Sequence, residues 1–130
     1  MEKFWLKNYQ EGVPAEISLD QFTSLKDMIE KTCSKFKDRP AFTNMGVSLT
    51  YAEMERQSRD FGAYLQKVAG LSKGDRVAIM MPNVLQYPVA LFACLRAGLV
   101  VVNVNPLFTP RELEHELKDS GAKVIIILEN

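Results

Sequence analysis

The sequence has few of the residues from which metal sites and nucleophilic sites are usually built. Among 130 residues it contains one histidine and two cysteines, Cys33 and Cys94. A disulfide framework or a zinc site needs more ligands at closer spacing. We therefore expect two buried thiols in a reducing cytoplasm. No group of carboxylates has metal-binding spacing, so no metal ligand is predicted.

The histidine, His115, has glutamates around it at Glu112, Glu114 and Glu116. A histidine flanked by carboxylates can act as a general base. The same pattern is typical of the solvated side of an amphipathic helix, and we favour that interpretation.

The sequence also lacks an excess of charge of either sign, since 16 basic residues balance 16 acidic ones. Nucleic-acid binding needs a basic stripe, and none is present. The amino-terminal residues are too polar for a signal peptide. The apolar run over residues 84–102 is interrupted by Gln86, Pro88, Arg96 and Gly98, which argues against a membrane span. It predicts a buried helix followed by a buried strand.

Glycine-rich phosphate loops are missing as well. The seven glycines occur singly, in neither the Walker A pattern nor the dinucleotide-binding pattern. No serine lies in a Gly-x-Ser-x-Gly elbow. These absences predict no catalytic residue, and they count against a flavodoxin-like nucleotide binder.

What the chain does contain is an ordinary globular mixture, with 47% hydrophobic and 25% charged residues. A chain of this length fits one domain. Residues 1–22 are predicted to form an irregular amino-terminal arm that packs onto the body through Trp5, Leu6, Tyr9 and Phe22. Residues 23–130 are predicted to form an α/β portion.

Local signals in the first half predict two helices and a hairpin. Ser24 is an N-cap candidate with Asp27 three residues later, and this helix ends before Pro40. Two short strands, 41–45 and 47–49, flank Gly46. Thr50 and Glu53 match a capping box. The long helix that follows has one predicted buried face, which comprises Met54, Ser58, Phe61, Leu65 and Val68.

From Arg76 onward, predicted strands and helices alternate with short connections. The strands are 76–81, 99–104 and 123–128, and the helices are 84–97 and a segment that Thr109 and Glu112 cap. This last helix turns Leu113 and Leu117 inward. The alternation predicts βαβ units and a parallel-type sheet with helices on both faces. The strands over residues 100–104 and 124–128 are apolar on both faces and need cover, without which the chain exposes apolar surface, self-associates or rearranges.

Several segments are similar to core motifs of adenylate-forming enzymes. Residues 49–54 (LTYAEM) resemble the first motif, and residues 95–98 (LRAG) with Asn105-Pro106 resemble the second. Residues 81–92 and 102–115 look like bacterial long-chain fatty-acid–CoA ligases. The resemblance covers essentially the whole chain. It implies an α/β fold that forms part of the large amino-terminal domain of such an enzyme.

The resemblance also implies the chemistry of the parent enzyme. A fatty-acid carboxylate attacks the α-phosphate of ATP, and CoA then displaces AMP, with Mg²⁺ offsetting phosphate charge. The parent's partners are therefore a long-chain fatty acid, ATP and CoA. Its expected location is the cytoplasm. A homo-oligomer and a peripheral contact with the inner face of the cytoplasmic membrane are left open.

Four family elements are not found in residues 1–130: the phosphate loop, the Tyr-Gly-x-Thr-Glu segment, the ribose-binding aspartate and the lysine of a mobile carboxy-terminal domain. We therefore expect this piece of the enzyme to be inactive by itself. An adenylation or luciferase-type enzyme with another acceptor remains an alternative, as does a non-enzymatic interaction module.

The resemblance implies one site in this segment. The loop Asn105-Pro106-Leu107 corresponds to a loop near the adenine end of CoA in related synthetases. A plain connection between strand and helix is the alternative. Arg111 follows in the first turn of the next helix, as a phosphate neighbour or as a surface charge.

Overall fold

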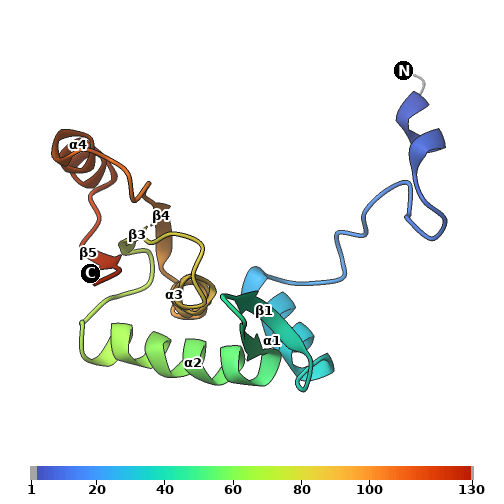
Figure 1. Cartoon of the computed structure of the whole chain (residues 1–130), viewed down its shortest axis with the longest axis horizontal. Helices are drawn as coiled ribbons and strands as arrows, with labels where there is room; N and C mark the ends of the chain where they lie inside the picture. Colours follow the sequence, from blue (N-terminus) through green and yellow to red (C-terminus); the bar gives the residue numbers. More distant parts are fainter. Residues whose placement is uncertain (1–2, 130) are drawn as a thin grey trace.

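A computed structural model describes residues 3–129 and confirms the α/β class (Figure 1). The elements in chain order are η1 (Phe4–Asn8), α1 (Leu25–Lys35), β1 (Pro40–Asn44), β2 (Val47–Thr50), α2 (Tyr51–Lys67), β3 (Arg76–Met80), α3 (Gln86–Arg96), β4 (Val100–Asn103), α4 (Pro110–Ser120) and β5 (Val124–Ile127).

Three parallel strands form the sheet in the order β4-β3-β5. Ala78 in the central strand pairs with Val102 on one side and with Ile125 on the other. The central strand is buried on both faces, because Val77, Ala78 and Ile79 are at most 1% exposed. α3 lies on one face and α4 on the opposite face (Figure 1). This arrangement confirms the predicted βαβ units.

The main core lies between the sheet, α3 and α2. Val77 and Ile79 point to this face and pack with Leu65 of α2 and Cys94 of α3. Gly62 allows the two helices to approach closely, since a Cβ there would lie 3.1 Å from the carbonyl oxygen of Ala93. α2 is therefore held in place by its packing against α3 and the sheet.

A second cluster joins α1 and the β1–β2 hairpin to the same helices. Its buried members are Ile29, Cys33, Leu49 and Met54. Arg96 of α3 reaches into this region, with Nη1 3.0 Å from Glu30 of α1 and Nη2 3.5 Å from Glu55 of α2. This one guanidinium thus links three helices.

The predicted hairpin is confirmed. β1 and β2 pair antiparallel around Met45 and Gly46, both of which have positive φ angles, 49° and 80°. Such angles are typical of a tight two-residue hairpin turn.

The three predicted helix caps are also confirmed. Ser24 Oγ accepts from the backbone N–H of Asp27 at 3.1 Å. Thr50 and Thr109 each form a complete capping box, with Glu53 and Glu112 respectively. Pro110 occupies the first turn of α4, where its missing N–H is least costly.

The α4 side of the sheet is only partly covered. α4 has no buried residue, and Leu113 and Leu117 are half-buried rather than fully inward. Its carboxyl end is fixed by Arg76, whose Nε donates to the Ser120 carbonyl at 2.9 Å and whose Nη2 donates to the Gly121 carbonyl at 3.2 Å.

Other predictions about burial, and one about where a helix begins, were wrong. Val68 is 69% exposed because α2 ends there, beyond the reach of α3. β4 is not fully buried, and Val100 is 48% exposed, because β4 is an edge strand. α3 begins at Gln86 and not at residue 84, since Val84 is in a turn closed by its N–H to the Pro82 carbonyl.

The predicted packing of the arm through Trp5 and Tyr9 was wrong as well. Residues 4–8 form a 3-10 helix, and Trp5 and Tyr9 are 41% and 44% exposed. The Trp5 ring packs edge-on against its neighbour Phe4, at a centroid distance of 5.4 Å, and not against the body of the protein. Phe22 is half-buried, with Lys31 of α1 over its ring. The arm extends away from the helices in Figure 1.

Candidate functional site

The predicted CoA-side loop, Asn105-Pro106-Leu107, follows β4 at the carboxyl edge of the sheet. The Asn105 side-chain oxygen accepts the Leu107 backbone N–H at 3.0 Å, and the Asn105 carbonyl accepts the Phe108 N–H at 3.0 Å. These bonds fix a tight turn in which Leu107 is 88% exposed. The carboxyl edge of a parallel sheet is where α/β proteins usually bind ligands.

The amino terminus of α4, next to this loop, is not free to bind a phosphate. Glu112 accepts the Thr109 backbone N–H at 2.8 Å, and Thr109 Oγ1 accepts the Glu112 N–H at 3.4 Å. These hydrogen bonds from Thr109 hold the pKa of Glu112 below its ordinary value. A carboxylate therefore stands where an anionic ligand would bind, which favours an uncharged ligand group at this loop. Arg111 beside it is exposed.

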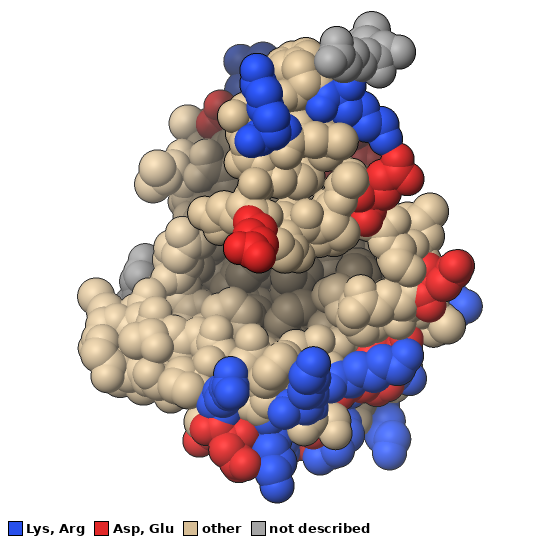
Figure 2. Space-filling model, turned by 90° about the vertical axis from the view of Figure 1, so that its right-hand side faces the viewer, with Lys and Arg blue, Asp and Glu red and all other residues tan. Residues whose placement is uncertain are grey.

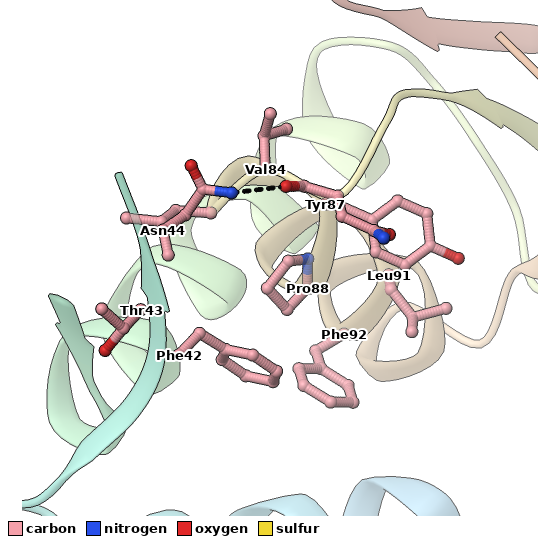
Figure 3. A pocket seen from close by; sticks show the side chains of 10 residues that line it. Phe42, Thr43, Asn44, Val84, Tyr87, Pro88, Leu91 and Phe92 are labelled. Carbon is pink, nitrogen blue, oxygen red and sulfur yellow. Dashed lines mark hydrogen bonds between the residues drawn. The ribbon is translucent and has the colours of Figure 1, made fainter. Parts of the chain in front are cut away.

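A pocket of about 310 Å³ lies between the β1–β2 hairpin and the amino-terminal part of α3 (Figure 3). Phe42 and Phe92 lie next to each other along one side of it, with Pro88 and Leu91 also turned toward the cavity. None of the lining residues carries a charge; they are Phe42, Thr43, Asn44, Asn83, Val84, Leu85, Tyr87, Pro88, Leu91 and Phe92.

Hydrogen bonds already engage polar side chains at the pocket. The Asn44 amide donates to the Asn83 carbonyl at 2.6 Å, which ties the hairpin to the turn before α3. The Tyr87 hydroxyl donates to Asn103 Oδ1 at 2.8 Å. Because Asn103 ends β4, this bond connects the pocket with the edge of the sheet that carries the Asn105 loop.

Sequence reasoning missed this pocket. Its walls come from a hairpin and a helix that are about 40 residues apart in the chain, so no local pattern joins them. A signal was present in α3, where Leu91 and Phe92 are adjacent, so that the apolar surface of the helix is too broad for one buried stripe.

The two cysteines and the single histidine lie outside these regions. Burial raises the pKa of the Cys94 thiol to about 11, and burial also raises that of Cys33. Such thiols are unreactive at neutral pH. His115 is exposed, as predicted. Within residues 3–129 no group of three metal-ligating side chains comes together. In the same residues, no helix combines the length and apolarity needed to cross a bilayer.

The geometry therefore describes a scaffold with an uncharged pocket and a loop at the ligand-binding edge of a parallel sheet. A family model described as AMP-binding enzyme matches residues 29–130. The match covers most of the chain, and the chain belongs to this family. The match begins within α1 and so includes every element that forms the sheet and its main core.

Within the family, the chain is similar to long-chain-fatty-acid–CoA ligases. The Yersinia pestis enzyme is 60% identical over 130 residues, which are 100% of this chain and 23% of the relative. The Bacillus subtilis enzyme is 38% identical over 128 residues, 98% of this chain and 22% of the relative. The chain thus spans less than a quarter of the length of these relatives.

Solved structures agree with this assignment. The amino-terminal subdomain of Klebsiella oxytoca NpsA, in complex with anthranilyl-AMSN, has a TM-score of 0.78 and 29% identity, and the match covers 82% of this chain and 28% of that one. A benzoate CoA ligase from Burkholderia xenovorans has a TM-score of 0.76 and 27% identity, covering 80% and 21%. The predicted kinship with adenylate-forming enzymes is confirmed.

Proposed function

We propose that this chain forms the amino-terminal scaffold of a long-chain fatty-acid–CoA ligase. The observation that carries the proposal is the 60% identity that extends over all 130 residues to such an enzyme. In the whole enzyme, a fatty-acid carboxylate attacks the α-phosphorus of ATP and pyrophosphate leaves. The CoA thiolate then attacks the acyl carbonyl of the acyl-adenylate, and AMP leaves with the electron pair of the cleaved C–O bond.

The role of this segment in that reaction is to help position the substrates, and no residue of it takes part in the bond changes. Asn105, Pro106 and Leu107 are proposed to contact the adenine ring of CoA, which is uncharged, and this agrees with the carboxylate of Glu112 at the adjacent helix terminus. Mg²⁺ would offset charge on the ATP phosphates. The residues described here do not fit a metal site, because no suitable group of ligands occurs among them.

Two further parts of the proposal concern the surroundings of the enzyme. Val100 and Ile127, 48% and 59% exposed, leave apolar surface on both edge strands. We expect this surface to be covered in the whole enzyme and to cause self-association of the isolated chain. Sedimentation of a monodisperse monomer at high concentration would contradict this.

We also propose a peripheral membrane contact, since the substrate partitions into bilayers. Cosedimentation with phospholipid vesicles tests this contact.

A chimera tests the central proposal. Residues 1–130 of this chain replace the matching segment of the Escherichia coli O157:H7 relative, which is 59% identical over the same 130 residues. We expect palmitate-dependent release of AMP that requires CoA. The isolated 130-residue chain is expected to show no fatty-acid-dependent exchange of pyrophosphate into ATP. An inactive but folded chimera would refute the assignment.

An acyl-adenylating enzyme with another acceptor is the alternative. It is favoured by the similarity to Klebsiella oxytoca NpsA in an artificially fused adenylation–PCP di-domain, which is 29% identical, the match covering 82% of this chain and 20% of that one. If the full-length enzyme exchanges pyrophosphate into ATP in a palmitate-dependent way but forms no thioester when CoA is added, this alternative is correct.

A further inference from the structure

A second hollow, of about 270 Å³, lies between α1, α2 and α3 and differs from the uncharged pocket in its charge. Its lining includes three cationic side chains, Lys26, Arg59 and Arg96, and one carboxylate, Glu30. We call it the cationic hollow. Figure 2 shows lysine and arginine side chains gathered along the lower edge of the molecule, which is the level of α1 and α2 in Figure 1. Both features point to a ligand of negative charge.

Arg96 is the buried cation of the cationic hollow, and some of its hydrogen-bonding groups are unused. Its side chain is 8% exposed, and Nη1 donates to Glu30 at 3.0 Å. Nη2 lies 3.5 Å from Glu55, but within residues 3–129 neither Nη2 nor Nε has a hydrogen-bond partner. Because a guanidinium carries five N–H donors, and buried donors without acceptors are costly, Arg96 has donors left for a ligand with several acceptor atoms.

The other two cations are within reach of a dissolved anion. Lys26 and Arg59 are both exposed. Arg59 Nη1 lies 3.3 Å from Glu55, and a guanidinium that is paired through one nitrogen keeps N–H groups for a second acceptor. The three cations of the hollow stand against two carboxylates, Glu30 and Glu55, so that positive charge is in excess there.

The chemistry of the hollow favours an oxyanion with several oxygen atoms. Arginine and lysine bind phosphate groups well, because a guanidinium donates two parallel hydrogen bonds and an ammonium supplies a compact charge. Phosphate brings enough oxygen atoms to accept from all the cations at once. Since one water molecule takes up about 30 Å³ in the liquid, the cavity of about 270 Å³ has room for phosphate and a few water molecules.

The cationic hollow is separate from the edge of the sheet that carries the Asn105 loop. Its lining residue Ala97 directly follows α3, and Gln66 near the end of α2 donates to the Ala97 carbonyl at 3.4 Å. α3 ends just before β4 begins, whereas Asn105 follows the carboxyl end of β4. The hollow is therefore distinct from the proposed CoA contact.

We propose that the cationic hollow binds a phosphate group, which accepts hydrogen bonds from Arg96, Lys26 and Arg59. The Glu30 side chain is 45% exposed and turns outward to admit the anion, which frees Nη1 of Arg96 as well. Inorganic phosphate and the headgroup of an anionic phospholipid share this chemistry. The proposal goes beyond the proposed function and does not rest on it, because no substrate of the ligase enters the argument.

The test follows the Nε–H signal of Arg96 by NMR while sodium phosphate is added to the 130-residue chain at pH 7. We expect a saturable shift of this signal, together with shifts of the Gly62 and Ala63 amide signals, which lie in the lining. Sodium chloride at equal ionic strength is the control, and it should leave the Arg96 signal unchanged.

Variants at exposed positions test the site without disturbing the core. Lys26→Met and Arg59→Met together should weaken phosphate binding by about tenfold, since each removes an exposed charge. Glu30→Gln should strengthen it by about threefold, because a like charge is lost. The matched control is Lys31→Met, which removes a positive charge from α1 outside the hollow, at a side chain that is 57% exposed, and it should bind phosphate like the unaltered chain.

A shift that chloride reproduces, or phosphate binding that the Lys26→Met/Arg59→Met chain retains in full, would overturn the proposal. Cosedimentation with phosphatidylglycerol vesicles then distinguishes the two sources of phosphate. If the double variant loses cosedimentation and Lys31→Met keeps it, the site binds a lipid headgroup. If the double variant binds vesicles normally but phosphate weakly, the site is confirmed as one for free phosphate.

Discussion

The two faces of the three-stranded sheet are covered in different ways. On the α3 face, Val77 and Ile79 are buried against α3 and α2, and dense packing holds the layers together. On the other face, α4 has no buried residue and is attached through the hydrogen bonds of Arg76 at its carboxyl end. The elements on the first face should unfold only together with the whole domain. α4 should unfold locally, at a smaller free energy of unfolding.

The largest expected effect comes from removing a buried side chain on the α3 face. Ile79→Ala deletes apolar atoms from a site that is 1% exposed, and should lower the free energy of unfolding by about 3 kcal/mol. Denaturant unfolding measures this. Ile127→Ala is the matched control on the opposite face, where the side chain is 59% exposed, and should cost less than about 1 kcal/mol. Equal losses would refute the contrast.

A smaller effect should follow from releasing the carboxyl end of α4. Arg76→Met keeps the aliphatic part of the side chain but removes the two hydrogen bonds to the Ser120 and Gly121 carbonyls. Bonds from a charged donor are typically worth about 2 kcal/mol. Amide hydrogen exchange in α4 should therefore accelerate by more than tenfold, while exchange in β3 stays close to its original rate. Arg59→Met, at an exposed position on α2, serves as control.

The two capping boxes allow the same change to be made on both sides. Thr50→Ala and Thr109→Ala each remove a cap worth about 1 kcal/mol. Because α2 packs against α3, the Thr50 variant should lower the midpoint of global unfolding. The Thr109 variant should instead accelerate exchange in α4 alone. If Thr109→Ala lowers the global midpoint as much as Thr50→Ala, α4 unfolds together with the core.

The smallest effect concerns pH. The folded-state pKa of Glu112 lies below its ordinary value of 4.5 because Thr109 donates to the carboxylate. Its stabilising contribution is therefore fully present above pH 4.5 and is lost as the pH falls through the lowered value. Exchange in α4 should accelerate in that acidic range. Glu112→Gln keeps a side chain that can complete the box but does not titrate, and should remove this part of the pH dependence.

Features set by neighbours in sequence could be predicted. Ser24, Thr50 and Thr109 cap helices because each side-chain oxygen accepts a backbone N–H that the first helical turn leaves free. The continuous run of Val77, Ala78 and Ile79 correctly predicted a strand that is buried on both faces. Such signals need no knowledge of the distant chain.

Features that depend on distant neighbours were not predictable in the same way. The exposed position of Val68 depends on where α3 ends, and the exposed face of β4 depends on strand order. The uncharged pocket joins Phe42 to Phe92 across separate elements. The CoA-side loop stays a prediction, since its turn geometry is compatible with a binding loop and also with a plain connection.

The strand order also bears on how the chain acquires its structure. β3 is synthesised first but has to pair on both sides, with β4 after one helix and with β5 only after a second helix. The pairing of β3 with β4 closes a much shorter loop, so it should form earlier during folding and during synthesis on the ribosome. Until β5 arrives, one edge of β3 stays open, and an unpaired strand edge of this kind makes a nascent chain prone to aggregation.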